Sequence, residues 1–405
     1  MSKFNVSQFR QQFAFFAHNP SWVYLDSAAT MHKPHAVVEA ELAFYQIANS
    51  NVHRGAHHLS QQATQLYEQA RDTVAGFINA KLRHEVIFTA GTTAALNQLA
   101  FGLMHTLLKP GDRILLTALE HHANIVPWQL HCQRHGVIID VVPLTADHCI
   151  DLAAYKKLLA LGPKVVSFSH ISNVLGHIQP VAQMVALAKA AGAVTVIDGA
   201  QGIVYQQPDM QQLDCDFYVF SGHKLYGPTG IGVLYGKTAQ LERLTPIFAG
   251  GEMIDTVSFV NTTFNKLPFR LEAGTPNIAG ALGLSTAIEW LQKFNNQQML
   301  QHKSLLLKEF YSGLNSIKAI DILSMPVHNA GIVALNVSGE HPSDVAELLN
   351  QQQVAVRSGQ HCAMPLFSYL AQQGAVRCSF AAYNTLDDVN RCLLALEQAV
   401  EILTA

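Results

Sequence analysis

Between about residues 85 and 235, the sequence alternates short apolar runs with longer stretches of helical periodicity. Strands that alternate with helices form a mostly parallel sheet with helices on both faces. The sequence therefore predicts an α/β fold. We expect its strands at residues 85–89, 113–117, 137–142, 165–168, 194–197 and 217–220.

Polar side chains follow most of these strands directly. Ligands of open parallel sheets bind at the carboxyl ends of the strands, so side chains placed there surround one site. This repeated placement predicts a ligand site at one edge of the sheet. The residues concerned are Thr92, Thr93, His121, Asn173, Asp198, Gln201, Ser221, His223 and Lys224.

Lys224 is the one lysine among these residues, and a glycine-rich loop follows it. A lysine in a partly dry pocket can lose its proton and act as an amine nucleophile. A surface lysine in a turn fits the local pattern as well. Similarly, Thr92 and Thr93 at a strand-to-helix turn suit a phosphate group, although an ordinary threonine helix cap fits too.

Together, a phosphate turn, a carboxylate, an imidazole and a lysine at neighbouring strand ends suggest pyridoxal 5'-phosphate. The lysine would bind the cofactor. A carboxylate would keep the pyridine nitrogen protonated, so that the ring accepts electrons from the substrate. An imidazole would stack on the ring, and hydroxyl and N–H groups would neutralise the phosphate.

Bulk composition excludes several other classes. The chain has 405 residues and a formal net charge of −3, which gives no nucleic-acid signature. No apolar run is long enough to span a membrane, and Met1 to Arg10 is not a secretory signal. The six cysteines form no CxxC pair, which favours free thiols in the cytoplasm over disulfides or a metal site.

After Gly236 the pattern changes, and from about residue 300 it predicts a smaller α+β unit. We expect a large domain over residues 19–290, and a small domain formed by residues 1–18 and 291–405. The small domain has predicted helices at 303–314 and 342–352 and predicted strands at 331–337, 354–357 and 375–380. Its loop over residues 358–365 carries Cys362. The N-terminal residues 4–16 are expected to form one short amphipathic helix.

Seven segments of the chain resemble the class V aminotransferase family of fold type I pyridoxal-phosphate enzymes, and most closely the cysteine desulfurases. The resemblance runs from about residue 20 to the C-terminus. It implies a large, mostly parallel seven-stranded sheet and a smaller α+β domain. The segments are residues 24–29, 51–55, 120–128, 172–174, 198–201, 221–232 and 272–277.

The resemblance implies a role for each matching residue. Lys224 would be the Schiff-base lysine, Asp198 would pair with the pyridine nitrogen, and His121 would stack on the ring and move a proton. Thr275 would reach in from the second subunit of a homodimer. The remaining cofactor contacts would come from Thr92, Thr93, Gln201, Ser221 and His223, and the substrate contacts from Asn173, Arg357, Arg377, His53 and Arg54.

Residues 357–362 resemble the active-site loop of the second desulfurase group, in which the cysteine is the sulfur-accepting nucleophile. Cys362 would take that role, and Arg357 and His361 would favour its thiolate. An inert buried cysteine fits the glycine-rich, polar surroundings poorly. The Gly359 and Val257 segments are closest to the cysteine sulfinate desulfinase branch.

The implied activity converts L-cysteine to L-alanine, with a persulfide on Cys362 that passes to a small acceptor protein, as in iron–sulfur cluster assembly. Selenocysteine and cysteine sulfinate are further possible substrates. The alternatives are a selenocysteine lyase, another class V activity, or a catalytically idle scaffold for a sulfur carrier.

Two departures from the family pattern stand out. At the phosphate turn, this chain has Ala90 and Ala94 where family members commonly have an arginine and a glutamate. Two opposite charges are lost there, but the hydroxyl groups remain. A second thiol, Cys378, follows Arg377 directly and fits a core cysteine better than a sulfur acceptor.

Overall fold

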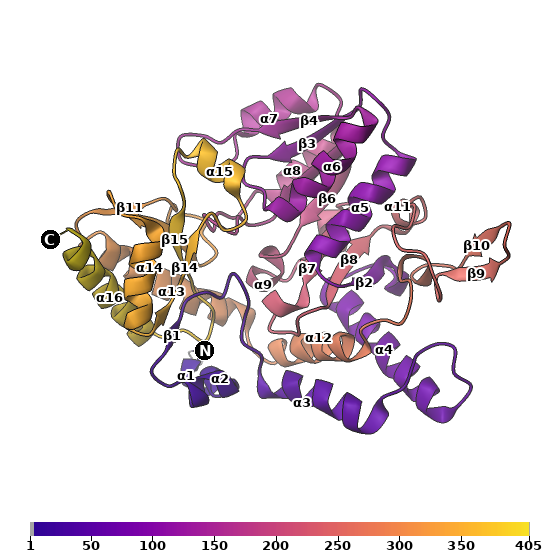
Figure 1. The fold of residues 1–405 in the computed structure, drawn as a ribbon, viewed down its shortest axis with the longest axis horizontal. Coiled ribbons are helices and arrows are strands. Elements are labelled where there is room, and N and C mark those ends of the chain that lie inside the picture. Colours follow the sequence, from indigo (N-terminus) through magenta and orange to yellow (C-terminus); the bar gives the residue numbers. More distant parts are fainter. Residues whose placement is uncertain (1–3, 405) are drawn as a thin grey trace.

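The computed structural model describes residues 4–404 and has a seven-stranded sheet at its centre (Figure 1). Its strand order is β2-β8-β7-β6-β5-β3-β4. Only β8 runs antiparallel to its neighbours, so the predicted mostly parallel sheet is confirmed. The strands are β2 (Val86–Thr89), β3 (Arg113–Thr117), β4 (Ile138–Val142), β5 (Val165–Ser169), β6 (Val194–Asp198), β7 (Phe217–Ser221) and β8 (Gly232–Gly236).

Helices cover both faces of this sheet, because successive strand residues point to opposite sides. In β7, Phe217 and Val219 pack with α5 (Thr92–Thr106) and α6 (Val126–His135). Tyr218 and Phe220 pack into the core on the other face. The helices of that second core are α4 (His58–Phe77), α7 (Leu152–Leu159), α8 (Val181–Ala190) and α12 (Ile278–Leu291).

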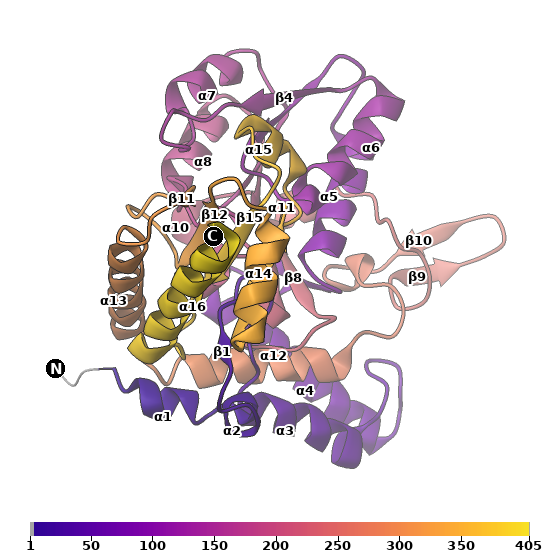
Figure 2. The ribbon, with the colours of Figure 1, turned by 60° about the vertical axis from the view of Figure 1, so that its left-hand side comes forward.

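A second, antiparallel sheet of four strands has the order β11-β12-β15-β14. Three helices pack on it around an apolar core of their own (Figure 2). The strands are β11 (Ile320–Ile322), β12 (Ile332–Val337), β14 (Arg357–Gly359) and β15 (Ala375–Ser379), and the helices are α13 (Asn296–Leu314), α14 (Pro342–Gln351) and α16 (Leu386–Thr404).

The expected single strand at 354–357 is wrong, because the chain changes partner within it. Residues of β13 (Val354–Ala355) pair in parallel with β1 (Val23–Tyr24), whereas β14 pairs with β15. The expectation of one helix at residues 4–16 is also wrong, because the chain forms two short helices there. They are α1 (Val6–Arg10) and α2 (Ala14–His18). Phe9 of α1 packs its ring against Tyr226 and Trp290, and Phe16 of α2 packs against Tyr383.

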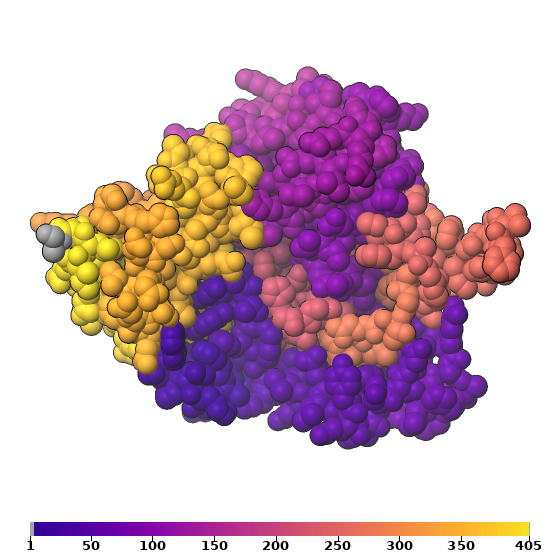
Figure 3. Space-filling model, viewed as in Figure 1, coloured from indigo at the N-terminus to yellow at the C-terminus, as the bar shows by residue number. Residues whose placement is uncertain are grey.

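A hairpin that the sequence did not predict projects from the large-sheet side of the molecule (Figures 1 and 3). Its strands are β9 (Ile254–Val257) and β10 (Thr262–Phe264), and at its tip Phe259 and Val260 are fully exposed. The remaining helices are α3 (His35–Ala43), a π-helix at Phe44–Ala48, α9 (Gly202–Tyr205), α10 (Met210–Leu213), α11 (Thr238–Leu241), α15 (Met364–Tyr369) and 3-10 turns at Arg83–Glu85, His122–Asn124, Gly222–Lys224 and Phe269–Leu271.

Within residues 4–404, we find no helix with both the length and the apolar character that crossing a membrane requires.

Candidate active site

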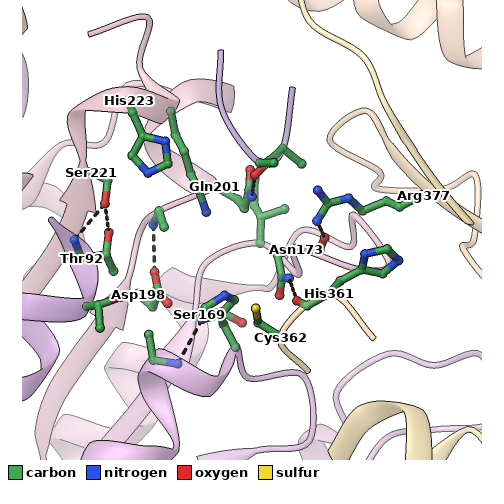
Figure 4. A pocket seen from close by; sticks show the side chains of 18 of the residues that line it. Thr92, Ser169, Asn173, Asp198, Gln201, Ser221, His223, His361, Cys362 and Arg377 are labelled. Carbon is green, nitrogen blue, oxygen red and sulfur yellow. Dashed lines mark hydrogen bonds between the residues drawn. The ribbon is translucent and has the colours of Figure 1, made fainter. Parts of the chain in front are cut away.

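The carboxyl ends of β5, β6 and β7 open into a cavity of about 240 Å³, and the loop after β14 closes its far side (Figure 4). Figure 4 shows Thr92, Asp198 and Ser221 on one side of the cavity, and Asn173, His361 and Cys362 on the other. The structure thus brings most of the predicted site residues together. They are Thr92, Thr93, His121, Asn173, Asp198, Gln201, Ser221, His223, Lys224, Arg357, Cys362 and Arg377.

Lys224 ends the 3-10 turn that follows β7, and its side chain lines the cavity. No hydrogen bond to its amine is found among residues 4–404. Burial lowers the pKa of this amine to about 8, with Arg377 and Arg357 acting in the same direction and Asp198 opposing them. At pH 7 roughly a tenth of the amine is therefore unprotonated and nucleophilic, and this form becomes dominant above about pH 8.

Asp198 is the last residue of β6 and is buried at the cavity wall. Its carboxylate accepts a hydrogen bond from the backbone N–H of Ala200 at 2.9 Å. Burial raises the pKa of this carboxyl, and the positive charge of Lys224 opposes that rise. A cation placed against Asp198 would keep it ionised. Gln201 donates from its side-chain amide to the carbonyl of Ala28 at 2.7 Å.

The predicted phosphate turn is built around a contact between Thr92 and Ser221. The Ser221 hydroxyl oxygen accepts from the Thr92 backbone N–H at 2.8 Å and shares a second 2.8 Å bond with the Thr92 hydroxyl. Gly91, just before α5, has φ +146, and a Cβ there would lie 3.2 Å from the Ser221 oxygen. Thr93 is exposed at the start of α5 and lines the same cavity.

His121 caps a short 3-10 turn, and its Nδ1 accepts from the backbone N–H of Ala123 at 3.0 Å. The ring proton is therefore on Nε2. Burial lowers the pKa of His121 to about 4, with Lys224 adding to the effect. His223 has a similarly lowered pKa of about 4, again mainly because of burial. Both rings are neutral near pH 7.

Arg377 lies on β15 and is almost fully buried. Its two Nη atoms donate to the carbonyl of Asn173 at 2.8 Å and to Asp26 Oδ1 at 2.9 Å. Its Nε is buried and has no hydrogen-bond partner among residues 4–404. Asn173 in turn donates from Nδ2 to the His361 carbonyl at 2.7 Å. These contacts tie the two sheets together beside the cavity.

Cys362 is the exposed cysteine among the six free thiols, and it lines the cavity together with Arg357. The expectation that His361 would supply positive charge to this thiol is wrong. His361 is buried, its Nε2 donates to the Ala375 carbonyl at 3.0 Å, and burial lowers its pKa to about 3. Arg357, which is exposed, and Arg377 supply the cationic charge at this end of the cavity.

Three predicted site residues do not line this cavity. His53 lies between Glu68 and Glu252, with its two ring nitrogens 3.1 Å and 3.0 Å from their carboxylate oxygens. Arg54 pairs with Glu252 at 2.9 Å. Thr275 lies in a separate cavity of about 270 Å³, which is also lined by Ala90 and Ala94.

The residue-by-residue prediction missed Ser169 and the role of Glu120. Ser169 ends β5, and its hydroxyl oxygen is buried in the cavity wall without a hydrogen-bond partner in the described part of the chain. Like Asp198, it is the last residue of a strand, so the same rule would have found it. Glu120 is buried behind the wall and accepts hydrogen bonds from Asn124 Nδ2 at 2.6 Å and the Ser169 N–H at 3.1 Å.

The cavity fits pyridoxal 5'-phosphate better than a metal ion. Among residues 4–404, no group of three or more histidine, cysteine or acidic side chains is arranged to hold a metal. Instead the wall combines a lysine amine, a buried carboxylate, two neutral imidazoles and a hydroxyl pair at a helix start. The Arg377 Nε and the Ser169 hydroxyl are buried there, and neither has a partner among the residues that the structure describes, which leaves polar capacity for a bound molecule.

Comparison with known proteins agrees with this geometry. Residues 23–392 match the family model "Aminotransferase class-V". A probable cysteine desulfurase of Vibrio cholerae is 46% identical over 381 residues, 94% of each chain. A cysteine desulfurase of Serratia proteamaculans is 42% identical over 404 residues, 99% of each chain.

Solved structures agree as well. The cysteine desulfurase CsdA (S-sulfonic acid) from Escherichia coli superposes with a TM-score of 0.92 at 41% identity, over 99% of this chain and 100% of that one. The apo cysteine desulfurase of Thermococcus onnurineus NA1 has a TM-score of 0.94 at 36% identity, with the same coverage. The resemblance seen in the sequence is thereby confirmed, and the chain belongs to the class V aminotransferase family.

Proposed function

We propose that this protein is a pyridoxal-phosphate-dependent cysteine desulfurase, which converts L-cysteine to L-alanine and takes up the sulfur on Cys362. One observation carries the proposal: a lysine amine with a pKa of about 8 and an exposed thiol line the same cavity from the two sheets. The kinship to cysteine desulfurases over nearly the whole chain supports it.

The cofactor would be held at both ends by residues of the large sheet. Lys224 would bind its aldehyde carbon, and Asp198 would meet its pyridine nitrogen. Thr92, Thr93, Ser221 and His223 would hold its phosphate, and Gln201 its ring oxygen. When bound, this cofactor supplies an electron sink for the carbanion that forms at the substrate α-carbon.

The chain's own groups would move the protons. The Lys224 amine would remove the α-proton, because near its pKa of about 8 it can both take and give a proton. His121 carries its proton on Nε2, so it would stack on the cofactor as a neutral ring and donate from that nitrogen.

Cys362 would take the sulfur. Its thiolate attacks the substrate Sγ, so that a new S–S bond forms while the substrate Cβ–S bond breaks, and the electron pair of that bond stays with the carbon. The carbon is reduced to the methyl group of alanine, and the sulfur is left at the oxidation level of a persulfide. Arg357 and Arg377 line the same cavity as the Cys362 sulfur.

The substrate carboxylate would bind at Arg377 and Asn173. The guanidinium is already fixed through Asp26 and the Asn173 carbonyl, and its unpartnered Nε lies in a buried wall of the cavity. Arg357 would add a second, exposed cation. A fixed planar cation suits recognition of a carboxylate, because little side-chain freedom is lost on binding.

We further propose a homodimer in the cytoplasm. Thr275 does not line the cavity of its own chain, which suits a role in the partner's site. The exposed apolar tip of the β9–β10 hairpin also suits burial against a second copy. In this arrangement His53 and Arg54 would contact substrate only across the dimer. A small sulfur-acceptor protein would receive the persulfide, with iron–sulfur cluster assembly as its destination.

The domain boundaries stay a proposal: residues 19–290 for the large domain, and 1–18 with 291–405 for the small one. The strands of the seven-stranded sheet lie within residues 86–236, and those of the four-stranded sheet within 320–379, which supports the division. Residues 1–3 and 405 of this assignment lie outside the described part of the chain.

The test is to incubate the holoenzyme with L-cysteine, measure alanine, and map persulfide by mass spectrometry. We expect alanine and a sulfur adduct on Cys362, and loss of both in Cys362→Ala. Cys149→Ala is the matched control, because that thiol lies outside the cavity. Alanine release from Cys362→Ala at the wild-type rate would overturn the nucleophile assignment. Activity confined to selenocysteine would favour a lyase.

A further inference from the structure

His122 holds the loop that carries Cys362, although its own side chain does not line the cavity. Its backbone N–H donates to the Cys362 carbonyl at 2.7 Å. Its ring Nε2 accepts from the Met364 backbone N–H at 2.9 Å. Two hydrogen bonds of one residue thus hold the chain on both sides of Ala363. Because Nε2 accepts, the ring proton is on Nδ1.

The loop that carries Cys362 requires these hydrogen bonds because its backbone is strained. His361 and Cys362 are consecutive residues with φ +47 and +56. Left-handed conformations are unfavourable for residues that carry a Cβ atom. Strain of this kind persists only where the surrounding structure over-determines it. On the other side of the loop, Asn173 fixes the His361 carbonyl at 2.7 Å.

The same short turn also carries the cavity-facing imidazole. His122 begins the 3-10 turn His122–Asn124, and the His121 ring caps that turn. His121 and Cys362 both line the cavity. His122 connects them, because it follows His121 in the sequence and hydrogen-bonds to Cys362. The position of the thiol is therefore coupled directly to the position of the imidazole.

We propose that His122 is a positioning residue, which sets the Cys362 thiol against the substrate sulfur by joining the cysteine loop to the His121 turn. This inference rests on the proposed desulfurase function. A reacting pair must be aligned closely, since a displacement of about 1 Å can cost roughly 100-fold in rate. We call the two hydrogen bonds of His122, to the Cys362 carbonyl and from the Met364 N–H, the clasp. A substitution of His122 can remove only the second bond, because the first is made by the backbone.

Two substitutions form a matched pair. In His122→Gln, the side-chain carbonyl oxygen is separated from Cβ by the same number of bonds as Nε2, so it can still accept from Met364. In His122→Asn, the carbonyl oxygen stops one bond short, at the level of Nδ1, and the bond is lost. Both variants keep the backbone bond to Cys362 and are similar in polarity.

The first measurement follows persulfide on Cys362 in single-turnover experiments with cysteine, alongside the change in cofactor absorbance on substrate binding. We expect persulfide formation about 10- to 100-fold slower in His122→Asn, with substrate affinity unchanged and the rate largely restored in His122→Gln. Equal rates in wild type and His122→Asn would overturn the inference, and so would equal losses in both variants.

The second measurement needs no turnover and compares alkylation of Cys362 by iodoacetamide, with the half-buried Cys149 as an internal reference. A loosened loop should expose Cys362, so we expect its alkylation to be several-fold faster in His122→Asn and Cys149 to be unchanged. Unchanged alkylation of Cys362 contradicts the clasp. If wild type forms no persulfide at all, the proposed function fails, while the alkylation comparison still decides on the clasp.

Discussion

Oε1 of Glu120 lies 3.1 Å from the backbone nitrogen of Ser169, so a buried carboxyl group joins the segment after β3 to the end of β5. The same carboxyl group also accepts from the Thr117 hydroxyl and from Asn124 Nδ2. It therefore holds in place the turn that carries His121, without touching the cavity itself.

We predict that Glu120→Ala lowers the free energy of unfolding by about 3 kcal/mol, because it leaves several buried donors without an acceptor. The His121 turn should loosen at the same time and weaken cofactor retention. Thermal unfolding and the bound-cofactor absorbance after dialysis check both expectations. Unchanged stability would show that the donors find other acceptors.

Lys224 predicts a pH dependence of cofactor uptake. Its lowered pKa of about 8 means that the unprotonated amine, which is the form that adds to an aldehyde, becomes dominant as the pH rises through about 8. The rate at which cofactor-free protein gains visible absorbance should rise over this range and then level off. Lys224→Ala should gain no such band, and a rate without pH dependence near pH 8 would contradict the assignment.

Lys303 on α13 is buried, and no ion pair of its amine is found among residues 4–404. Burial lowers its pKa from 10.5 to about 8. The folded state therefore carries a full penalty below pH 8, which is relieved as the pH rises towards 10.5. We expect Lys303→Met to raise the free energy of unfolding by about 2 kcal/mol at neutral pH. Urea unfolding at several pH values should also show a flatter pH dependence for the variant.

Gly91 predicts a specific sensitivity at the phosphate turn. In Gly91→Ala, the new methyl group meets the Ser221 hydroxyl oxygen at 3.2 Å in a backbone with φ +146. Gly111→Ala is a matched control, because Gly111 also has a positive φ, +88, but a Cβ there meets nothing within 4 Å. Both variants should lose about 1 kcal/mol of stability through backbone strain. Only Gly91→Ala should also weaken cofactor binding, as measured by titration.

The sequence predicted the part of the site that local rules control. Asp198 and Lys224 follow apolar strands, and the parallel order of those strands brings them to one edge. The charge of His361 could not be predicted in the same way, because a pKa of about 3 results from burial between segments distant in the chain. The glycine-rich, polar residues around His361 suggest an exposed imidazole that could carry a positive charge.

Tertiary pairing explains the remaining differences. Residues 354–357 have the composition of one strand, but Val354 pairs with Val23 and Arg357 with Arg377, in two different sheets. Likewise, the sequence did not predict β8, because its glycines suggest a loop. The segment forms a strand because it pairs with β2 on one side and β7 on the other. The hairpin of β9 and β10 buries little apolar surface in this chain, so no periodicity marks it.

The pairing of β1 with β13 also fixes the order in which the site can be built during synthesis. Asp26 bridges to Ser379 and ion-pairs with Arg377, so it can meet these partners only after residue 379 has been made. The strands that carry Asp198 and Lys224 are translated much earlier. The lysine side of the site is thus available to fold before residues 357–379, which include the wall that presents the thiol.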